Sequence, residues 1–248
     1  MLWISHRGES WDAPENTLPA FRLSRERRTD GMECDVHLTA DGKLVVCHDS
    51  DTQRTCSRSM VIEESCYADL QNLTANNNKA GFEEVKIPLF AETLQYLGQE
   101  RVYYVEIKNN DPAVIDALIA ELDQAAVPPE QVVMISFHAN IVKLFKARYP
   151  ERKALFLTSF KVSQQGTWTP TADELIKQLQ ELGADGVDIH CNLNFIVPEY
   201  VNKVKAAGFA FAVWTVDDEA AARRFAAMGV DAITSNRAAA LQMSLDKK

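Results

Sequence analysis

Two carboxylates and a histidine share one short stretch, residues 31–49, of this 248-residue chain. The dipeptide Asp41-Gly42 predicts a hairpin with a two-residue turn, because such turns need positive φ at both central positions. This turn places Asp35 opposite His48, and the side-chain period of two puts Glu33 on the same face as Asp35. Three titratable groups on one face of an otherwise apolar hairpin indicate a site for chemistry rather than a solvated surface.

A third carboxylate and a lysine occur in a later apolar run. Glu106 and Lys108 are two residues apart and therefore share one face of the expected strand. Neighbouring carboxylates raise one another's pKa unless a counter-charge is present, and a divalent cation supplies that charge. Oxygen ligands suit Mg²⁺, Ca²⁺ or Mn²⁺ better than zinc. We therefore expect one divalent cation, with both Mg²⁺ and Ca²⁺ open, at Glu33, Asp35 and Glu106.

Two histidines and further charged residues flank this region. His6 and His48 are suited to acid and base work, because imidazole titrates near neutral pH. Arg7 offers a planar fork for a phosphate group, and Lys108 offers a point charge. Glu15 could orient Arg7 or His6, but a Pro-Glu-Asn-Thr segment is also a good helix start, so both interpretations stay open.

The elements that must position these residues follow a repeating order. Short apolar runs alternate with amphipathic stretches, which is typical of repeated βα units. We expect eight strands, at residues 2–6, 31–39, 102–108, 132–137, 153–158, 186–190, 209–215 and 231–235, with 44–48 as the return arm of a hairpin. We expect helices near residues 17–28, 90–97, 113–124, 141–149, 172–182, 198–206, 219–228 and 238–245. Eight such pairs predict an α/β fold, a single (β/α)8 TIM barrel.

Active sites of this fold lie at the C-terminal ends of the barrel strands, and the candidate residues fit that rule. Asp188 and His190 are two residues apart on the sixth expected strand and could line the mouth of the barrel. Candidates stand at or near the ends of seven of the eight expected strands: His6 and Arg7, Glu33 and Asp35, Glu106 and Lys108, Ser136-Phe137-His138, Asp188 and His190, Trp214, and Ser235-Asn236.

Composition narrows the class of protein. The length favours one domain covering residues 1–248, and the net charge of −9 with a pI near 5.1 argues against a nucleic-acid surface. Five cysteines without a Cys-x-x-Cys spacing fit free thiols in a reducing compartment, so we expect a cytoplasmic protein. Neither a basic leader nor an apolar run of roughly 18 residues occurs, and we expect neither export nor stable membrane insertion. The oligomeric state is unknown from these patterns.

Residues 50–87 form an insertion between the hairpin and the helix that precedes the third expected strand. They include a weakly helical stretch, 65–73, and a polar run, 74–81. Connections this long inside a compact barrel are usually functional lids or small subdomains. We therefore expect a small cap segment here.

Taken together, the motifs resemble the glycerophosphodiester phosphodiesterase family. The similarity runs from residue 2 to about residue 236 and depends on order, spacing and strand context. The motifs are His6-Arg7-Gly8, Ala13-Pro14-Glu15-Asn16-Thr17, Glu33-x-Asp35-Val36, Thr39-x-Asp41-Gly42, Val46-Cys47-His48-Asp49 and Glu106-Ile107-Lys108.

The resemblance implies a (β/α)8 barrel with a small cap that hydrolyses small-molecule glycerophosphodiesters to glycerol 3-phosphate and an alcohol. It also implies that the glycerol C2 hydroxyl attacks phosphorus. Trp214 could pack against the glycerol or alcohol moiety, or belong to the core. Matched by position, the acid–base pair would be His6 and His48, the metal ligands Glu33, Asp35 and Glu106, and the phosphate-neutralising cations Arg7 and Lys108.

Two departures from the family pattern leave the substrate preference open. Residues 9–12 are acidic, and Thr234-Ser235-Asn236 stands where members often have Thr-Asp. A phospholipase-like or sphingomyelinase-D-like phosphodiesterase or lyase would carry an apolar, membrane-facing rim, whereas the insertion is mostly polar. A catalytically inert barrel that binds phosphorylated ligands would lack one of the histidines or carboxylates, and none is missing.

Overall fold

Eight parallel strands form a closed barrel in the computed structural model, which describes residues 1–164 and 166–246. The strands follow chain order around the barrel, and β1 (Leu2–Ser5) closes it by pairing with both β2 (Gly31–Leu38) and β11 (Ala232–Ser235). The expected barrel is confirmed. The remaining barrel strands are β4 (Val102–Ile107), β5 (Val132–Ser136), β6 (Lys153–Thr158), β9 (Gly186–His190) and β10 (Ala210–Trp214).

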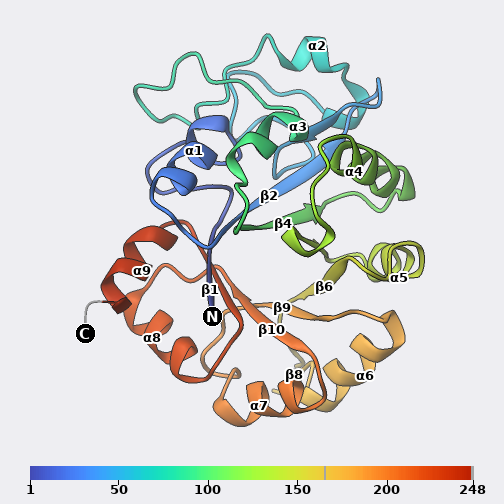
Figure 1. Cartoon of the computed structure of the whole chain (residues 1–248), viewed down its shortest axis with the longest axis vertical. Coiled ribbons are helices and arrows are strands. Elements are labelled where there is room, and N and C mark those ends of the chain that lie inside the picture. The colour runs from blue at the N-terminus through green and yellow to red at the C-terminus, as the bar shows by residue number, and fades with distance from the viewer. Residues whose placement is uncertain (165, 247–248) are drawn as a thin grey trace.

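Helices surround the strands, as Figure 1 shows. Three of them begin where local sequence signals place a start: Asp111, Thr171 and Asp218 each accept a backbone N–H of the first turn. Short 3-10 helices, Leu94–Tyr96 and Pro129–Gln131, precede β4 and β5. The helices are α1 (Leu18–Glu26), α3 (Phe90–Thr93), α4 (Pro112–Gln124), α5 (Ala139–Arg148), α6 (Ala172–Leu182), α7 (Pro198–Ala206), α8 (Glu219–Ala227) and α9 (Ala238–Asp246).

Alternate residues of each barrel strand face opposite ways. Val105 and Ile107 belong to a large apolar cluster between the strands and the helices. Ile4 and Ile135 belong to a smaller cluster that fills the barrel interior. Because side chains alternate along a strand, Glu106 faces inward between Val105 and Ile107 and lines a pocket. The strand pattern thus brings polar residues to one end of the interior.

The hairpin after β2 has a different register from the expected one. β2 pairs with an antiparallel strand, β3 (Leu44–Val46). The backbone N–H of Cys47 donates to the carbonyl of Asp35 at 3.0 Å, so Cys47 rather than His48 lies opposite Asp35. The predicted two-residue turn was wrong by one residue. His48 nevertheless reaches the pocket, because the chain leaves the ladder after β3.

Local backbone geometry explains the longer turn. Gly42 has a φ of 72°, whereas Asp41 does not adopt positive φ, so the turn carries one left-handed residue instead of two. The N–H of Thr39 donates to the carbonyl of Lys43 at 2.9 Å and closes a three-residue loop. The Asp41 carboxylate also accepts hydrogen bonds from the Thr39 hydroxyl (2.7 Å) and the backbone N–H of Tyr67 (3.0 Å). Residues 50–87, which follow the hairpin and include Tyr67, therefore help to hold its tip in place.

Residues 50–87, the cap segment, pack against this hairpin. They contain a 3-10 helix, Ile62–Glu64, and a single helical turn, α2 (Tyr67–Leu70), which is shorter than the helical stretch expected at 65–73. In Figure 1 the segment lies outside the ring of helices, above α1 and α3. It shares a small apolar core with the hairpin, made of Val45, Cys47, Ile62, Leu70, Leu73, Ala75 and Ile87.

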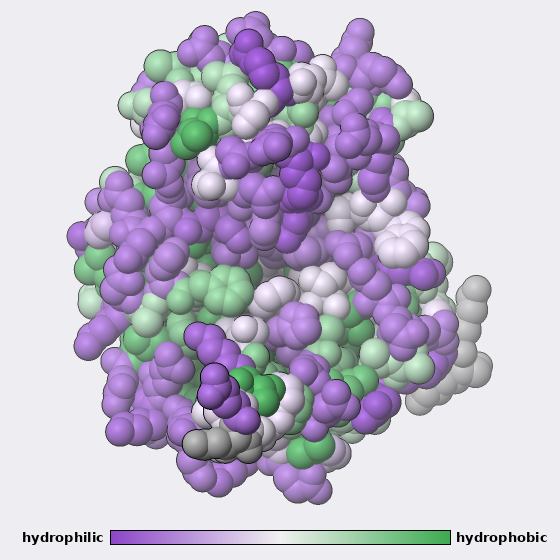
Figure 2. Space-filling view, turned by 180° about the vertical axis from the view of Figure 1, so that it is seen from behind, coloured by the Kyte–Doolittle hydropathy of each residue, from purple (hydrophilic) through white to green (hydrophobic). Residues whose placement is uncertain are grey.

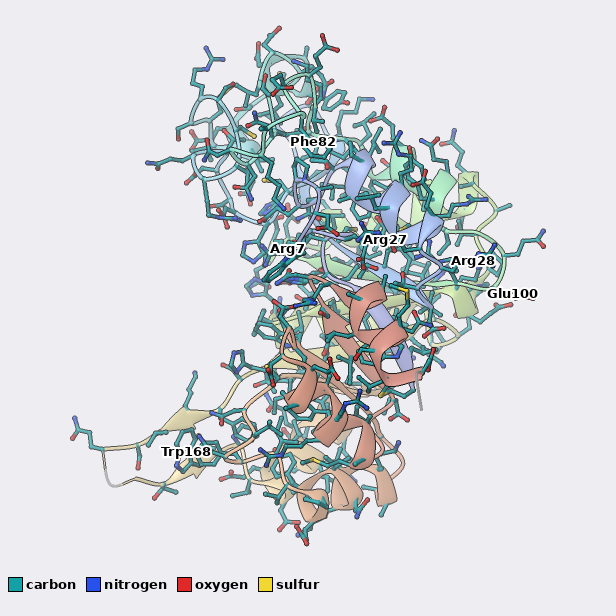
Figure 3. All side chains as sticks on the ribbon, turned by 90° about the vertical axis from the view of Figure 1, so that its left-hand side faces the viewer. Arg7, Arg27, Arg28, Phe82, Glu100 and Trp168 are labelled. Atoms are coloured by element: carbon teal, nitrogen blue, oxygen red, sulfur yellow. The ribbon has the colours of Figure 1, made fainter. Side chains whose placement is uncertain are left out.

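A second, short hairpin that the sequence did not predict follows β6. Its strands are β7 (Lys161–Val162) and β8 (Trp168–Thr169), and it projects from the barrel in Figure 3. Arg7 lies on the same side of the molecule as this hairpin, whereas Glu100, which precedes β4, lies on the opposite side (Figure 3). Among the described residues, none of the helices has the length and hydropathy that crossing a bilayer would need.

Candidate active site

A pocket opens at the C-terminal ends of the barrel strands. Figure 2 looks onto this side of the molecule, where hydrophilic residues gather in the upper part and hydrophobic ones are more frequent in the lower part. The residues that line the pocket are likewise divided into a mainly charged wall and a mainly apolar wall. Its reactive wall consists of His6, Arg7, Glu33, His48 and Glu106. Its second wall consists of Ile135, Phe137, Leu157, Asp188, Trp214 and Thr234.

Three carboxylates form a buried cluster at the reactive wall. Oxygen atoms of Glu33, Asp35 and Glu106 all lie within 4.8 Å of one another. Burial and the neighbouring Asp35 raise the pKa of Glu33 well above its usual range and raise the pKa of Glu106 to about 8. Burial would also raise the pKa of Asp35, but Arg7 and Lys108 outweigh it and hold that pKa below its usual range.

Two cationic side chains lie among these carboxylates. Lys108 Nζ is 2.8 Å from Glu106 Oε1 and 3.4 Å from Asp35 Oδ1, and Arg7 Nε is 3.3 Å from Asp35 Oδ2. Arg7 adopts a left-handed φ of 54° where the chain leaves β1, and its backbone N–H donates to Glu33 Oε2 at 2.8 Å. Asp35 Oδ1 has no hydrogen-bond partner among the described residues. This oxygen-only donor set, with one buried oxygen that has an ion-pair contact to Lys108 but no hydrogen bond, fits a divalent cation of the Mg²⁺ and Ca²⁺ class.

His6 is oriented by a neutral amide. Its Nδ1 lies 2.7 Å from Asn236 Oδ1, and Asn236 Nδ2 in turn donates to Asp217 Oδ2 at 2.6 Å. Because the amide oxygen faces the ring, Nδ1 of His6 carries the proton and Nε2 is left as an acceptor. Burial, followed by the charge of Arg7, lowers the pKa of His6 to about 4, so the ring is neutral at pH 7.

His48 is oriented by a carboxylate instead. Its Nδ1 lies 2.5 Å from Asp49 Oδ1, and Asp49 Oδ2 accepts a hydrogen bond from Arg54 Nε at 2.7 Å. The buried ring of His37 contacts the backbone of His48, with Nε2 3.3 Å from the carbonyl oxygen of His48. Burial lowers the pKa of His48, and the nearby Asp35 opposes this shift. The two imidazoles thus have partners of different charge.

Glu15 links the barrel to the cap segment. Its carboxylate accepts hydrogen bonds from Arg7 and from both terminal nitrogens of Arg54, each at 2.8 Å, and from Asn77 at 3.4 Å. Burial opposes ionisation, but Arg54 and Arg7 hold the pKa of Glu15 below its usual value. Of the two open interpretations, the contacts favour the one in which Glu15 orients Arg7, because the residue lies before α1 and contacts the arginines.

Trp214 lines the pocket and also packs against the apolar cluster inside the barrel. It ends β10 half-buried, and its Nε1 donates to the backbone carbonyl of Asp188 at 3.2 Å. Its ring packs edge-on against Phe137 and His190, with centroid distances of 5.7 and 5.3 Å. The contacts fix the indole on the second wall, close to the position expected from the sequence.

The structure brings every predicted site residue to this region, and it adds partners that the sequence did not predict. Asn16 donates to Asp35 Oδ2 at 2.8 Å, and it stands inside one of the quoted motifs, as does Asp49. Asn236 directly follows the last strand, β11, so its position was a usable signal. Arg54 lies in the irregular cap segment, where no periodic pattern marks it.

Comparison with known proteins agrees with this geometry. A glycerophosphodiester phosphodiesterase of Bacillus subtilis is 28% identical over 95% of this chain and 83% of its own length. One of Caldanaerobacter subterraneus subsp. tengcongensis is 29% identical over 95% of this chain and 93% of its own. A phosphodiesterase of Oleispira antarctica, solved in complex with the product sn-glycerol-3-phosphate, superposes with a TM-score of 0.87 at 28% identity, covering 98% of this chain and 96% of its own. The model of the glycerophosphoryl diester phosphodiesterase family matches residues 6–240, and the chain therefore belongs to that family.

Proposed function

We propose that this chain hydrolyses glycerophosphodiesters to glycerol 3-phosphate and an alcohol. The observation that carries the proposal is a pocket whose reactive wall joins a carboxylate cluster fit for a divalent cation, two imidazoles and an arginine. The family match and the Oleispira relative with its bound product support this choice of substrate class.

Glu33, Asp35 and Glu106 would hold the cation, either Mg²⁺ or Ca²⁺, since both ions use oxygen ligands. When bound, the cation would stabilise the negative charge that develops on the phosphoryl oxygens. Arg7 lies beside the cluster and would neutralise the phosphate with its planar fork. Lys108, which pairs with Glu106 and Asp35, would add a second positive charge at the same place.

The two histidines have the partners that acid–base catalysis needs. His6 is neutral, and its Nε2 is an acceptor, so it would remove a proton from the attacking hydroxyl. The carboxylate of Asp49 would stabilise His48 as an imidazolium, so His48 would donate a proton to the leaving alcohol. Arg54 holds Asp49 in place and so connects the cap segment to this step.

The glycerol C2 hydroxyl is the proposed nucleophile: its oxygen would attack phosphorus and expel the alcohol, giving a cyclic phosphate that one water molecule then opens to glycerol 3-phosphate. An internal hydroxyl converts a bimolecular attack into an intramolecular one, which can be worth several kcal/mol. Diesters without a neighbouring hydroxyl should therefore turn over poorly. A 2-deoxy analogue of glycerophosphocholine hydrolysed within about threefold of the parent compound would rule out this nucleophile.

The decisive experiment measures release of glycerol 3-phosphate from a panel of glycerophosphodiesters. The protein is first dialysed against a chelator, and Mg²⁺ or Ca²⁺ is then added back separately. We expect no release before metal is returned, and release with at least one of the two ions. Absence of glycerol 3-phosphate with every substrate and either ion would overturn the proposed function.

Two further features enter this proposal. We propose that residues 1–248 act as one barrel domain, with residues 50–87 as a cap that helps to hold Arg7 and His48 through Arg54. The five cysteines are unpaired, which supports a reducing compartment such as the cytoplasm.

A further inference from the structure

The second wall of the pocket contains two buried polar side chains, each with an atom that has no hydrogen-bond partner in the described part of the chain. Asp188 and Thr234 are each 1% exposed. Asp188 Oδ1 and Thr234 Oγ1 have no hydrogen-bond partner among the described residues, although both residues line the pocket. Their neighbours on this wall, Ile135 and Leu157, are apolar and cannot supply one.

Unpaired polar atoms at such a position indicate a ligand. A buried donor or acceptor without a partner costs about 1–3 kcal/mol, and most buried polar groups in proteins are hydrogen-bonded. Burial raises the pKa of Asp188 to about 8, so its carboxyl is largely protonated at neutral pH and can both donate and accept. The Thr234 hydroxyl has the same double capacity. A hydroxyl group of a ligand, which also donates and accepts, can hydrogen-bond to both side chains.

The indole of Trp214 contacts Asp188 and lines the same pocket as Thr234. Its Nε1 donates to the backbone carbonyl of Asp188, which ties the ring to the strand that carries the unpaired carboxyl. Phe137, which packs edge-on against Trp214, is 43% exposed. The second wall therefore runs from a closed polar end at Asp188 and Thr234 to an open aromatic end at Phe137.

We propose that Asp188 and Thr234 bind the terminal hydroxyl of the substrate's glyceryl group, with Trp214 packing against its carbon chain. This inference depends on the proposed function, because it assigns one end of that substrate. The glyceryl group is common to all glycerophosphodiesters and suits the closed end, whereas the leaving alcohol must depart through the open end. A cationic head group fits the closed end less well, because Arg7 and Lys108 lie across the pocket.

The test uses two substrates and three variants of the full chain. The substrates are glycerophosphocholine and its analogue built on propane-1,2-diol, which keeps the C2 hydroxyl and lacks the terminal one. The variants are Asp188→Leu, Asp188→Asn and Thr234→Val, and the control is Asp173→Asn on the exposed face of α6. Each protein is saturated with the metal that supports activity, and kcat/KM is measured for both substrates.

We expect the wild type to prefer glycerophosphocholine by about tenfold or more, because a site built to bond a hydroxyl rejects an analogue that lacks it. Asp188→Leu and Thr234→Val should lose about that factor with glycerophosphocholine and stay within about threefold with the analogue. Asp188→Asn, which keeps a donor and an acceptor, should retain more activity than Asp188→Leu. Retained activity on the analogue shows at once that a variant is folded.

Other outcomes overturn the inference. Equal losses with both substrates, or a wild type that does not discriminate between them, exclude a bond to the terminal hydroxyl. Glycerophosphoglycerol, whose head group is uncharged, is added as a third substrate for Asp188→Leu. If this variant slows glycerophosphocholine but not glycerophosphoglycerol, the carboxyl faces a cationic head group instead. A wild type that hydrolyses neither substrate refutes the proposed function itself, so the two failures are distinguishable. If Asp188→Leu does not fold, Thr234→Val and Asp188→Asn decide the question by the same comparison.

Discussion

The two walls of the pocket come from different halves of the chain and are held by different forces. All residues of the reactive wall precede residue 109, and its charged groups bond to one another, as when Glu15 joins Arg7 to Arg54. All residues of the second wall follow residue 131, and apolar and aromatic packing holds them, as at Trp214. A substitution on the reactive wall therefore leaves a buried charge without its partner, whereas one on the second wall mainly changes the fit of the ligand.

The largest loss should come from the carboxylates of the reactive wall. Asp35→Asn, Glu33→Gln and Glu106→Gln should each reduce kcat/KM by about tenfold to a thousandfold, because the cation loses a charged ligand. Asp35→Asn also removes the partner that Arg7 and Lys108 share. Excess metal should partly rescue the weaker cases. Full activity after dialysis against a strong chelator would contradict the role of the cluster.

The second-largest loss of activity should come from substitution of the two histidines. His6→Ala and His48→Ala should each lower kcat by roughly a hundredfold, and each should remove one limb of a bell-shaped pH profile. The double variant should be little worse than either single one, since the two rings act as a unit. Losses that multiply in the double variant would show that the rings act independently.

The reactive wall was also the more predictable of the two from the sequence. Glu33, Asp35 and Glu106 are visible because a charged residue at an inward position of an apolar strand is unusual, and the period of two shows that it shares a face with others. The eight-fold alternation of apolar runs and amphipathic stretches then predicts where these faces meet. The same pattern placed Asp188 at the mouth of the barrel, where it lines the pocket, but the roles proposed for Asp188 and Thr234 depend on the lack of a hydrogen-bond partner, which no sequence pattern shows.

What the sequence could not predict depends on contacts between distant segments. The hairpin turn has three residues, and the Asp41 carboxylate at its tip bonds to Thr39 and to Tyr67 of the cap segment. Arg54 reaches Asp49 and Glu15 from irregular chain, where neither a period of two nor one of 3.6 applies. Such bonds form only once the fold has brought the segments together.

Substitution on the second wall should cause a smaller loss of activity, which affects KM more than kcat. Trp214→Ala should raise KM about fivefold and leave kcat within about twofold, because the indole packs against the ligand and takes no part in proton transfer. Trp168→Ala on the projecting hairpin is the matched control and should change neither constant. A fall in kcat as large as that of the histidine variants would remove the distinction between the walls.

The smallest expected effect is on the stability of the folded protein. Its dependence on pH should differ between the two walls. Burial raises the pKa of Glu106 and that of Asp188 each to about 8, whereas carboxylates of an unfolded chain titrate near 4. A folded group with a raised pKa binds a proton that the unfolded chain has already lost, so its contribution to stability disappears as pH rises towards 8. Between about pH 6.5 and 8, above the range in which His6 and His48 titrate, the metal-free protein should therefore lose stability.

Metal should cancel this loss on the reactive wall alone, because the cation would compensate the ionised Glu106, whereas Asp188 is not part of the carboxylate cluster. Thermal unfolding in chelator should show a melting temperature that falls by a few degrees from pH 6.5 to 8, and saturating metal should make the fall shallower without abolishing it. Glu106→Gln should make the fall in melting temperature smaller in chelator, and added metal should then change that fall less. Asp188→Asn should make the fall smaller by the same amount with and without metal. An Asp188→Asn effect that disappears when metal is added would mean that both walls share one electrostatic site, and the comparison between them would fail.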